Sequence, residues 1–236
     1  MKKNGLIIAI DGPAAVGKST MGKLIARELG YTYIDTGAIY RAITWKVLKN
    51  NFNINNENII SDLVSDTCIT IERTNTNKLE NYNCIFVDGE DVTEEIRDPN
   101  IDRNVSQIAR LPKIRKQLIY LQRKLAEKGN IVMEGRDIGS VILPQADIKL
   151  YFTASEEERI KRRYTELKDK GYSVDYEEVK KQIVQRDEID SKRKYAPLIK
   201  AEDAIVIDST EKSIEEVREE ILEIIKKHRE CREKIN

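Results

Sequence analysis

Eight residues near the start of the chain have the types and spacing of a phosphate-binding loop. They are Gly12, Pro13, Ala14, Ala15, Val16, Gly17, Lys18 and Ser19, which fit the pattern G-x-x-x-x-G-K-S/T. In such a loop the backbone N–H groups surround the phosphates of a nucleoside triphosphate, and the lysine reaches the terminal phosphates. The hydroxyl of Ser19 can ligate magnesium. The sequence therefore predicts a nucleotide site that extends to Thr20, at the start of a helix.

Arginines elsewhere in the chain could hold a second anion opposite this loop. Phosphoryl transfer between two anionic partners needs positive groups that hold the acceptor and neutralise charge on the transferred group. Arginine suits this task because its planar guanidinium binds phosphate through two parallel hydrogen bonds. We interpret Arg163 as a solvated surface charge. The candidates for phosphate binding are Arg41, Arg136, Arg159, Arg162, Arg186 and Arg193.

A parallel sheet is expected to position these groups. Five short apolar runs separated by helical segments predict an α/β fold, with a five-stranded parallel sheet and helices on both faces. Such sheets bind ligands beyond the carboxyl ends of their strands. The phosphate loop, Asp35, Glu134–Asp137 and Asp208–Thr210 all follow predicted strands, and residues 35–37 are interpreted as a turn. We expect strands at 6–10, 31–34, 130–133, 148–152 and 204–207, and helices at about 18–29, 38–50, 98–109, 112–128, 155–168, 177–190 and 213–236.

The stretch from residue 53 to residue 98 departs from this alternation. It is rich in Asn, Thr and acidic residues, and strand-like pieces at 68–71 and 84–87 flank a polar segment at 74–83. Structureless loops of this length are uncommon in compact domains. We therefore predict a small inserted subdomain with a hairpin at 53–98, in preference to a long ordered loop, and a core formed by 1–52 and 99–236.

The overall composition argues against several other classes. Lysine plus arginine and aspartate plus glutamate both total 41, so the net charge is zero and nothing favours nonspecific binding to nucleic acid or acidic membranes. The three cysteines lack C-x-x-C spacing and His228 is the single histidine, which argues against a zinc site. No apolar stretch has the length of a signal peptide or a membrane span. We expect a cytoplasmic protein that binds neither nucleic acid nor membranes.

Longer segments carry a more specific resemblance than the phosphate loop does. Residues 10–14 (Ile-Asp-Gly-Pro-Ala), 35–41 (Asp-Thr-Gly-Ala-Ile-Tyr-Arg), 134–140 (Glu-Gly-Arg-Asp-Ile-Gly-Ser) and 196–198 (Ala-Pro-Leu) are similar, in this order, to segments of bacterial cytidylate kinases. Residues 207–210 fit the last strand of that family, so the resemblance covers almost the whole chain. The family belongs to the P-loop nucleoside monophosphate kinases. The resemblance implies ATP-dependent phosphorylation of CMP and dCMP, with Mg²⁺, by a monomer.

The resemblance also implies roles by position. Residues 53–98 would be the monophosphate-binding insert, and residues 155–170 a short helical lid. Gly12 to Thr20 would hold the ATP phosphates, and Arg159 and Arg162 would close over ATP. Lys18, Arg136, Arg162 and Arg186 would act in catalysis. CMP would be bound by Thr36, Tyr40, Arg41, Ser106, Arg115, Arg136, Asp137, Arg186, Asp190 and Arg193, among which Ser106, Arg115, Asp137 and Arg193 would surround the cytosine.

A carboxylate near the base suits a site that selects cytosine. Cytosine presents an amino donor where uracil presents an acceptor, so a carboxylate accepts a hydrogen bond from the first and faces another acceptor in the second. A site built on such bonds can discriminate by large factors. Asp137 is the candidate for this carboxylate. Asp190 is its rival, and Asp137 could instead orient a neighbouring arginine such as Arg136.

Two positions depart from the family pattern. Thr36 stands where serine also occurs, and it keeps the hydroxyl. Glu134 stands where aspartate is common, and its extra methylene could shift a water-mediated magnesium contact. We therefore assign only Ser19 to the metal, with ATP oxygens and water as the expected remaining ligands.

The residues alone leave other functions open. A kinase for UMP or another small acceptor would use the same loop and arginines. A regulatory GTPase or a nucleic-acid-binding ATPase would use the same loop, but the chain lacks an Asn-Lys-x-Asp segment and a basic stretch with aromatic residues. For a kinase, we expect the insert and the lid to close on the substrates and exclude water.

Overall fold

Five parallel strands form the main sheet of the computed structural model, which describes residues 5–73 and 83–235. Their spatial order is β2-β6-β1-β7-β8, with the phosphate-loop strand β1 at the centre. This sheet confirms the prediction from the apolar runs. The strands are β1 (Ile7–Asp11), β2 (Thr32–Asp35), β6 (Ile131–Glu134), β7 (Ile148–Thr153) and β8 (Ile205–Asp208).

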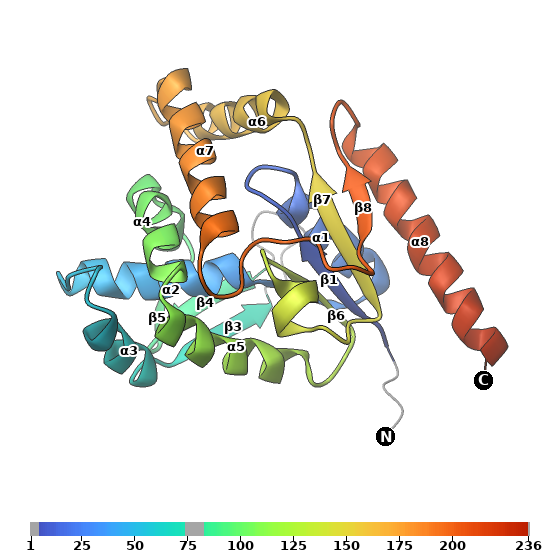
Figure 1. The fold of residues 1–236 in the computed structure, drawn as a ribbon, viewed down its shortest axis with the longest axis horizontal. Coiled ribbons are helices and arrows are strands. Elements are labelled where there is room, and N and C mark those ends of the chain that lie inside the picture. The colour runs from blue at the N-terminus through green and yellow to red at the C-terminus, as the bar shows by residue number, and fades with distance from the viewer. Residues whose placement is uncertain (1–4, 74–82, 236) are drawn as a thin grey trace.

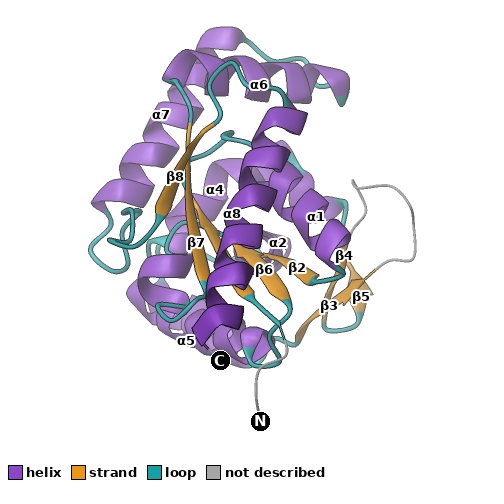
Figure 2. Cartoon of the chain, turned by 90° about the vertical axis from the view of Figure 1, so that its right-hand side faces the viewer, coloured by secondary structure: helices purple, strands orange, loops and turns teal. Residues whose placement is uncertain are grey.

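Helices cover both faces of this sheet because the central strand is apolar on both of its sides. Ile8 and Ile10 point toward α1 (Lys18–Leu29) and α8 (Ile214–Ile235), which lies along the sheet in Figure 2. Ile7 and Ala9 alternate with them and contribute to the core on the opposite face. Continuous apolar runs of this kind are typical of parallel strands buried on both faces. The opposite face is covered by α2 (Thr36–Lys49), α3 (Glu57–Ser65), α4 (Pro99–Ala109) and α5 (Pro112–Ala126).

Two helices lie beyond the carboxyl end of β7, where the predicted lid falls. Figure 1 shows α6 (Glu156–Asp169) and α7 (Tyr176–Lys192) at this end of the sheet, packed against each other. The Ser155 side chain accepts a hydrogen bond from the Glu158 backbone N–H, as expected of a helix cap. Helix α6 therefore begins where the sequence predicts.

The region between α2 and α4 contains a second, smaller sheet. Strands β3 (Ile69–Arg73), β4 (Asn83–Val87) and β5 (Glu90–Asp91) pair antiparallel, and Ile69 lies opposite Val87. The predicted hairpin pieces therefore pair. The polar segment predicted to join them, 74–83, lies outside the described residues except for Asn83. A short 3₁₀ turn, η2 (Glu95–Arg97), leads back to α4.

Helix α3 belongs with the larger core rather than with the small sheet. Its Ile60 and Val64 pack into the main hydrophobic cluster, and its Ser61 carbonyl accepts a hydrogen bond from Gln117 of α5. We therefore propose that residues 1–52 and 99–236 form the core and that residues 53–98 are inserted into it along the chain. Helix α3 belongs to the insert in sequence but packs on the core.

Two local predictions differ from the structure. The interpretation of residues 35–37 as a turn is wrong, because α2 begins at Thr36 directly after β2. Gly37 lies in its first turn, where a Cβ atom would come within 2.9 Å of Arg41 Nη1 and Asp35 Oδ1. A second difference is η3 (Ile138–Ile142), one turn of π-helix that the sequence analysis did not predict. Within the two described ranges, no helix combines the length and the apolar character needed to cross a membrane.

Candidate active site

The predicted phosphate loop connects β1 to α1 at the centre of the sheet. Gly12 has a φ of 146°, and a Cβ atom there would lie 2.3 Å from the carbonyl oxygen of Phe152. Only glycine fits so close to the neighbouring strand. Lys18 is buried, and its Nζ donates a hydrogen bond to the Pro13 carbonyl at 2.5 Å. The Lys18 side chain therefore bonds to the backbone of the loop that carries it.

Burial and the neighbouring charges act on the pKa of Lys18 in opposite directions. Burial lowers its pKa well below the ordinary value, and the nearby Arg136 and Arg186 add to this effect while Glu134 opposes it. A buried cation that lies near other cations is strongly stabilised when an anion binds beside it. The position therefore suits the binding of phosphate groups.

Ser19, the predicted magnesium ligand, lies against the end of β6. Its Oγ donates to Glu134 Oε1 at 2.5 Å, and Tyr33 OH donates to the same oxygen at 2.7 Å. Glu134 is buried, and its other oxygen, Oε2, has no hydrogen-bond partner. Burial raises the pKa of Glu134, and the neighbouring Asp35 adds to this effect. Two hard oxygen donors thus face each other between the loop and β6.

Asp11, at the end of β1, fixes the segment that carries Arg136 and Asp137. Its two carboxylate oxygens accept hydrogen bonds from the backbone N–H groups of Ile138 and Gly139, both at 2.7 Å. Burial raises the pKa of Asp11 to about 6, although the two N–H groups oppose this effect. In the sequence, Asp11 stands out only as part of the family segment at residues 10–14. The structure shows that it joins β1 to η3.

This pKa predicts how stability depends on pH. The folded state binds the Asp11 proton more tightly than the unfolded chain does, because its pKa is about 6 in place of 3.8. The resulting stabilisation is complete below the unfolded pKa and is lost as the pH rises through about 6. Asp11→Asn has no titrating group at this position and so does not show this loss. The difference in free energy of unfolding, variant minus parent, should therefore increase by about 1.4 kcal/mol when the pH is raised from about 5 to about 7.

Urea unfolding of the parent and Asp11→Asn at these two pH values measures the change. A difference between the two proteins that stays constant, or that moves the other way, would contradict the assignment.

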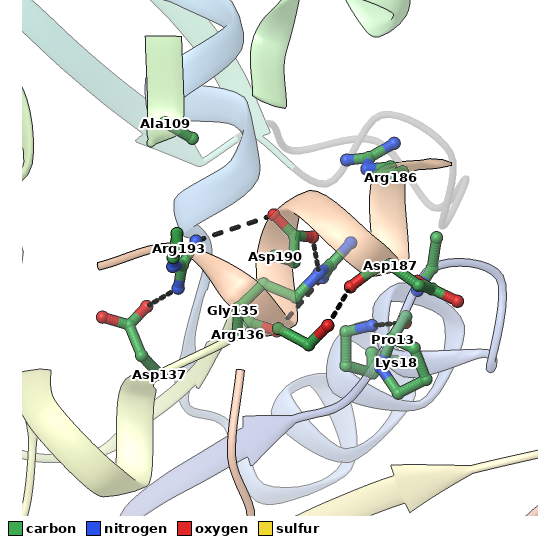
Figure 3. A network of polar contacts seen from close by, with 12 residues as sticks. Pro13, Lys18, Ala109, Gly135, Arg136, Asp137, Arg186, Asp187, Asp190 and Arg193 are labelled. Atoms are coloured by element: carbon green, nitrogen blue, oxygen red, sulfur yellow. Dashed lines mark hydrogen bonds and ion pairs between the residues drawn. The ribbon is translucent and has the colours of Figure 1, made fainter. Parts of the chain in front are cut away.

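Buried ion pairs connect the residues predicted to bind the acceptor. Arg136 Nε donates to Asp190 at 2.9 Å, and Arg193 lies between Asp190 (3.6 Å) and Asp137 (3.3 Å), as Figure 3 shows. Arg115 completes the chain by donating to Asp137 at 2.5 Å. Arg115, Asp137, Asp190 and Arg193 are all nearly inaccessible to solvent. The structure therefore brings these five predicted residues together, from α5, the end of β6, and α7.

This arrangement changes one interpretation of Asp137. Its partners are Arg115 and Arg193, and the carboxylate that orients Arg136 is Asp190. Asp137 does hold arginines in place, as the alternative expects, but they are Arg115 and Arg193 in place of Arg136. Both carboxylates hold arginines in place, and which of them would contact a base stays a prediction.

A second cluster gathers around Asp102 of α4. Arg41 Nε donates to Asp102 at 3.0 Å, Arg186 Nη1 lies 3.8 Å from it, and Arg163 donates to it as well. Arg163 also pairs with Glu166 at 2.8 Å. The interpretation of Arg163 as a solvated surface charge is therefore wrong, since its side chain is about three-quarters buried and pairs with two carboxylates.

The two lid arginines are both linked to the phosphate loop. Arg159 donates to the Ala14 carbonyl and to Asp187, and Asp187 in turn accepts from the Ala14 backbone N–H at 3.2 Å. Arg162 donates to Ser209 Oγ at 3.0 Å, and that hydroxyl donates to the Val16 carbonyl. The helix α6 is thus connected to the loop on two sides, directly and through the end of β8.

Three other predicted residues lie around this network. Thr36 Oγ1 donates to the Glu134 carbonyl at 2.7 Å, which ties the start of α2 to β6. Tyr40 is buried with its ring 5.3 Å from the Arg115 guanidinium, a cation–π contact. Ser106 is buried on α4, one turn beyond Asp102.

A small cavity lies between the start of α1 and the small sheet. Ser19 and Asp35 line it on one side, and Ile71, Asn83 and Arg97 line it on the other. The residues predicted to surround cytosine do not line this cavity, and three of them, Arg115, Asp137 and Arg193, form ion pairs with one another. The cavity nevertheless places the insert opposite the predicted metal ligand.

Sequence reasoning missed three carboxylates of the site, namely Asp11, Asp102 and Asp187. Asp102 precedes Ser106 by four residues and Asp187 precedes Asp190 by three, so helical spacing places each on the same face as a predicted residue. Extending the search for site residues along those faces would have found both. The signal for Asp11 was a polar residue that ends an otherwise apolar strand.

A central parallel sheet with a phosphate loop after β1, and arginines gathered at the carboxyl ends of its strands, defines a P-loop kinase. A solved structure of an uncharacterized protein from Eubacterium ventriosum shares the fold, with a TM-score of 0.53 at 14% identity, covering 95% of this chain and 99% of that one.

The chain belongs to the cytidylate kinase family, whose model matches residues 8–227. It is 48% identical to a cytidylate kinase of Caldicellulosiruptor bescii over 96% of this chain and 97% of that protein. It is 51% identical to a cytidylate kinase of Alkaliphilus metalliredigens over 92% of this chain and 94% of that protein. These findings confirm the resemblance seen in the sequence, and they do not favour the alternatives of a kinase for another acceptor or a regulatory GTPase or ATPase.

Proposed function

We propose that this protein transfers the γ-phosphoryl group of ATP to CMP and dCMP, giving CDP and dCDP. Membership of the cytidylate kinase family supports the substrates. The structural observation that carries the proposal is the buried arginine–carboxylate network beside Lys18, because it offers a polar, preorganised site for a second anionic nucleotide. We further propose a monomer in the cytoplasm that binds neither nucleic acid nor membranes.

In this proposal the phosphate loop holds the donor. The backbone N–H groups of residues 12–20 and the Lys18 ammonium bind the ATP phosphates. Arg159 and Arg162 approach the same phosphates from the lid, since both are already linked to the loop. The lid and the insert close to exclude water, which would otherwise compete for the phosphoryl group.

The acceptor lies opposite. Arg41, Arg136 and Arg186 hold its phosphate, one oxygen of which attacks the γ-phosphorus of ATP as the bond to the β-phosphate oxygen breaks and ADP leaves. The acceptor oxygen is already ionised, so no strong general base is required. Thr36, Tyr40 and Asp190 lie beside the ribose. The residues that contact the cytosine are Ser106, Arg115, Asp137 and Arg193.

Magnesium fits the oxygens between Ser19 and Glu134. Glu134 Oε2 is buried without a hydrogen-bond partner, and carboxylate and hydroxyl oxygens are the ligands that Mg²⁺ prefers. When bound, the ion would neutralise charge on the β- and γ-phosphates. In the part of the chain that the structure describes, no group of three or more His, Cys, Asp or Glu side chains is arranged to hold a metal. Ser19 and Glu134 would therefore share the ion with ATP and water.

The proposal is tested by incubating the protein with ATP, Mg²⁺ and CMP and separating the nucleotides. We expect CDP and ADP to form in equal amounts, and neither to form when CMP is left out. ADP that forms without CDP would show hydrolysis in place of transfer and would contradict the proposal.

Asp137→Asn should relax the choice of base. The amide can donate to the uracil oxygen that the carboxylate repels, so the ratio of kcat/KM for CMP to that for UMP should fall at least about tenfold. Asp137 also neutralises the buried Arg115 and Arg193, so we expect a lower Tm. The ratio is measured within one preparation and does not depend on the folded fraction. An unchanged ratio would remove Asp137 from the base site.

A further inference from the structure

Asp102 lies among three arginines that come from three different helices. Its Oδ1 accepts from Arg41 of α2 at 3.0 Å and lies 3.8 Å from Arg186 of α7, and its Oδ2 accepts from Arg163 of α6. Figure 1 shows α4 on the same side of the molecule as α2 and α7. A single carboxylate thus joins the lid to two arginines proposed to hold the acceptor phosphate.

The three arginines depend on Asp102 to different degrees. Arg41 has a second carboxylate, Asp35, at 3.5 Å, and Arg163 has Glu166 at 2.8 Å. For Arg186, Asp102 is the only recorded ion-pair partner among the described residues, and its Nε is buried without a hydrogen-bond partner. Asp102 is therefore the carboxylate that stabilises the Arg186 charge most, and Asp190 makes a smaller contribution.

The negative charge of Asp102 is permanent near neutral pH. Burial opposes its ionisation, but Arg41, Arg186 and Arg163 outweigh burial and hold the pKa of this carboxyl well below its usual range. Any anion that enters between Arg41 and Arg186 therefore meets a fixed charge of its own sign.

We propose that Asp102 is an internal counter-ion that competes with the acceptor phosphate for Arg41 and Arg186 and so limits the affinity for the monophosphate. The inference rests on the proposed function, in which these two arginines hold that phosphate. Like charges separated by a few ångströms repel strongly in a partly buried site. Asp102 touches the arginines and not the substrate, so it is a positioning residue.

Asp102→Asn tests the inference, because the side chain keeps its shape and loses its charge. Arg41 stays oriented by Asp35 and Arg163 by Glu166, whereas Arg186 is left for the ligand. We expect the Kd of CMP, measured by titration calorimetry, to fall about tenfold. The Kd of cytidine, which has no phosphate, should not change. A merely structural role would weaken the binding of both ligands.

Two control variants separate charge from shape. Asp102→Glu keeps the negative charge and should gain no affinity for CMP. Glu178→Gln removes an exposed carboxylate of α7 that pairs with Arg103, outside the cluster around Asp102, and should bind CMP like the parent. Gain of affinity in Asp102→Glu would overturn the inference.

The inference is also overturned if Asp102→Asn binds CMP no more tightly than the parent does while cytidine binding is unchanged. A parent that binds neither CMP nor cytidine would contradict the proposed function itself, and the inference with it. Should Asp102→Asn fail to fold, Arg163→Gln provides a second test. With one arginine fewer, Asp102 pairs more strongly with Arg41 and Arg186, so CMP affinity should fall while cytidine affinity stays constant. Unchanged CMP affinity in that variant would contradict the inference.

Discussion

Arg186→Met is expected to lower kcat/KM for CMP by about a thousandfold while the fold stays intact. Arginines that neutralise a transferred phosphoryl group contribute factors of about 10³ to 10⁵. Burial lowers the pKa of Arg186 to about 10, partly opposed by Asp102, and Arg136 and Arg41 lower it further. The folded protein therefore holds this cation at a cost, and the variant should unfold at the parent's Tm or above it.

The combination of lost activity and retained stability distinguishes a functional arginine from a structural one. Steady-state kinetics with CMP and a thermal unfolding curve measure the two quantities. Arg103→Met is the matched control, because Arg103 is exposed on α4 and pairs with Glu178, outside the predicted site. It should behave like the parent. Activity of Arg186→Met within tenfold of the parent would place the acceptor phosphate elsewhere.

Lys18→Met is expected to lower kcat by at least about a hundredfold. Removing one preorganised electrostatic contact to the transferred group typically costs a factor of about 10² to 10³. Lys18 is buried at the centre of the loop, so solvent cannot replace its charge. The variant keeps the length of the aliphatic stem and loses only the ammonium and its hydrogen bond to Pro13.

Single-turnover measurements with saturating ATP and CMP isolate the transfer step for this variant. Lys192→Met, an exposed lysine paired with Glu188, serves as the control and should leave kcat unchanged. A Lys18→Met protein that retains more than about a tenth of the parent's kcat would show that the loop lysine does not act on the transferred phosphoryl group.

The sheet could be predicted from the sequence because its strands are buried on both faces. Residues 7–10 and 131–133 are continuous apolar runs, which leave little choice of structure between the polar turns that bound them. The carboxyl ends of parallel strands meet at one edge of the sheet. Placing the phosphate loop, Asp35 and Glu134 together therefore needed only the strand assignment.

The pairing of charges could not be predicted in the same way. Each arginine has several carboxylates within reach of its long side chain, and only the packing of α4, α6 and α7 decides between them. Asp102 pairs with Arg163 at a separation of 61 residues, and no local pattern relates the two. The start of α2 at Thr36 depends on the distant Glu134 carbonyl that its hydroxyl binds. Such contacts appear only once the elements are in place.

In the proposed function, the arginine–carboxylate network holds a cytidine monophosphate opposite ATP. The most direct test measures kcat/KM with ATP and Mg²⁺ for a panel of acceptors: CMP, dCMP, UMP, AMP and a phosphate-free sugar acid. We expect CMP and dCMP to be phosphorylated at least about a hundredfold more efficiently than UMP and AMP, and the sugar acid not to be a substrate. A preference for UMP, AMP or the sugar acid over CMP would contradict the proposed function.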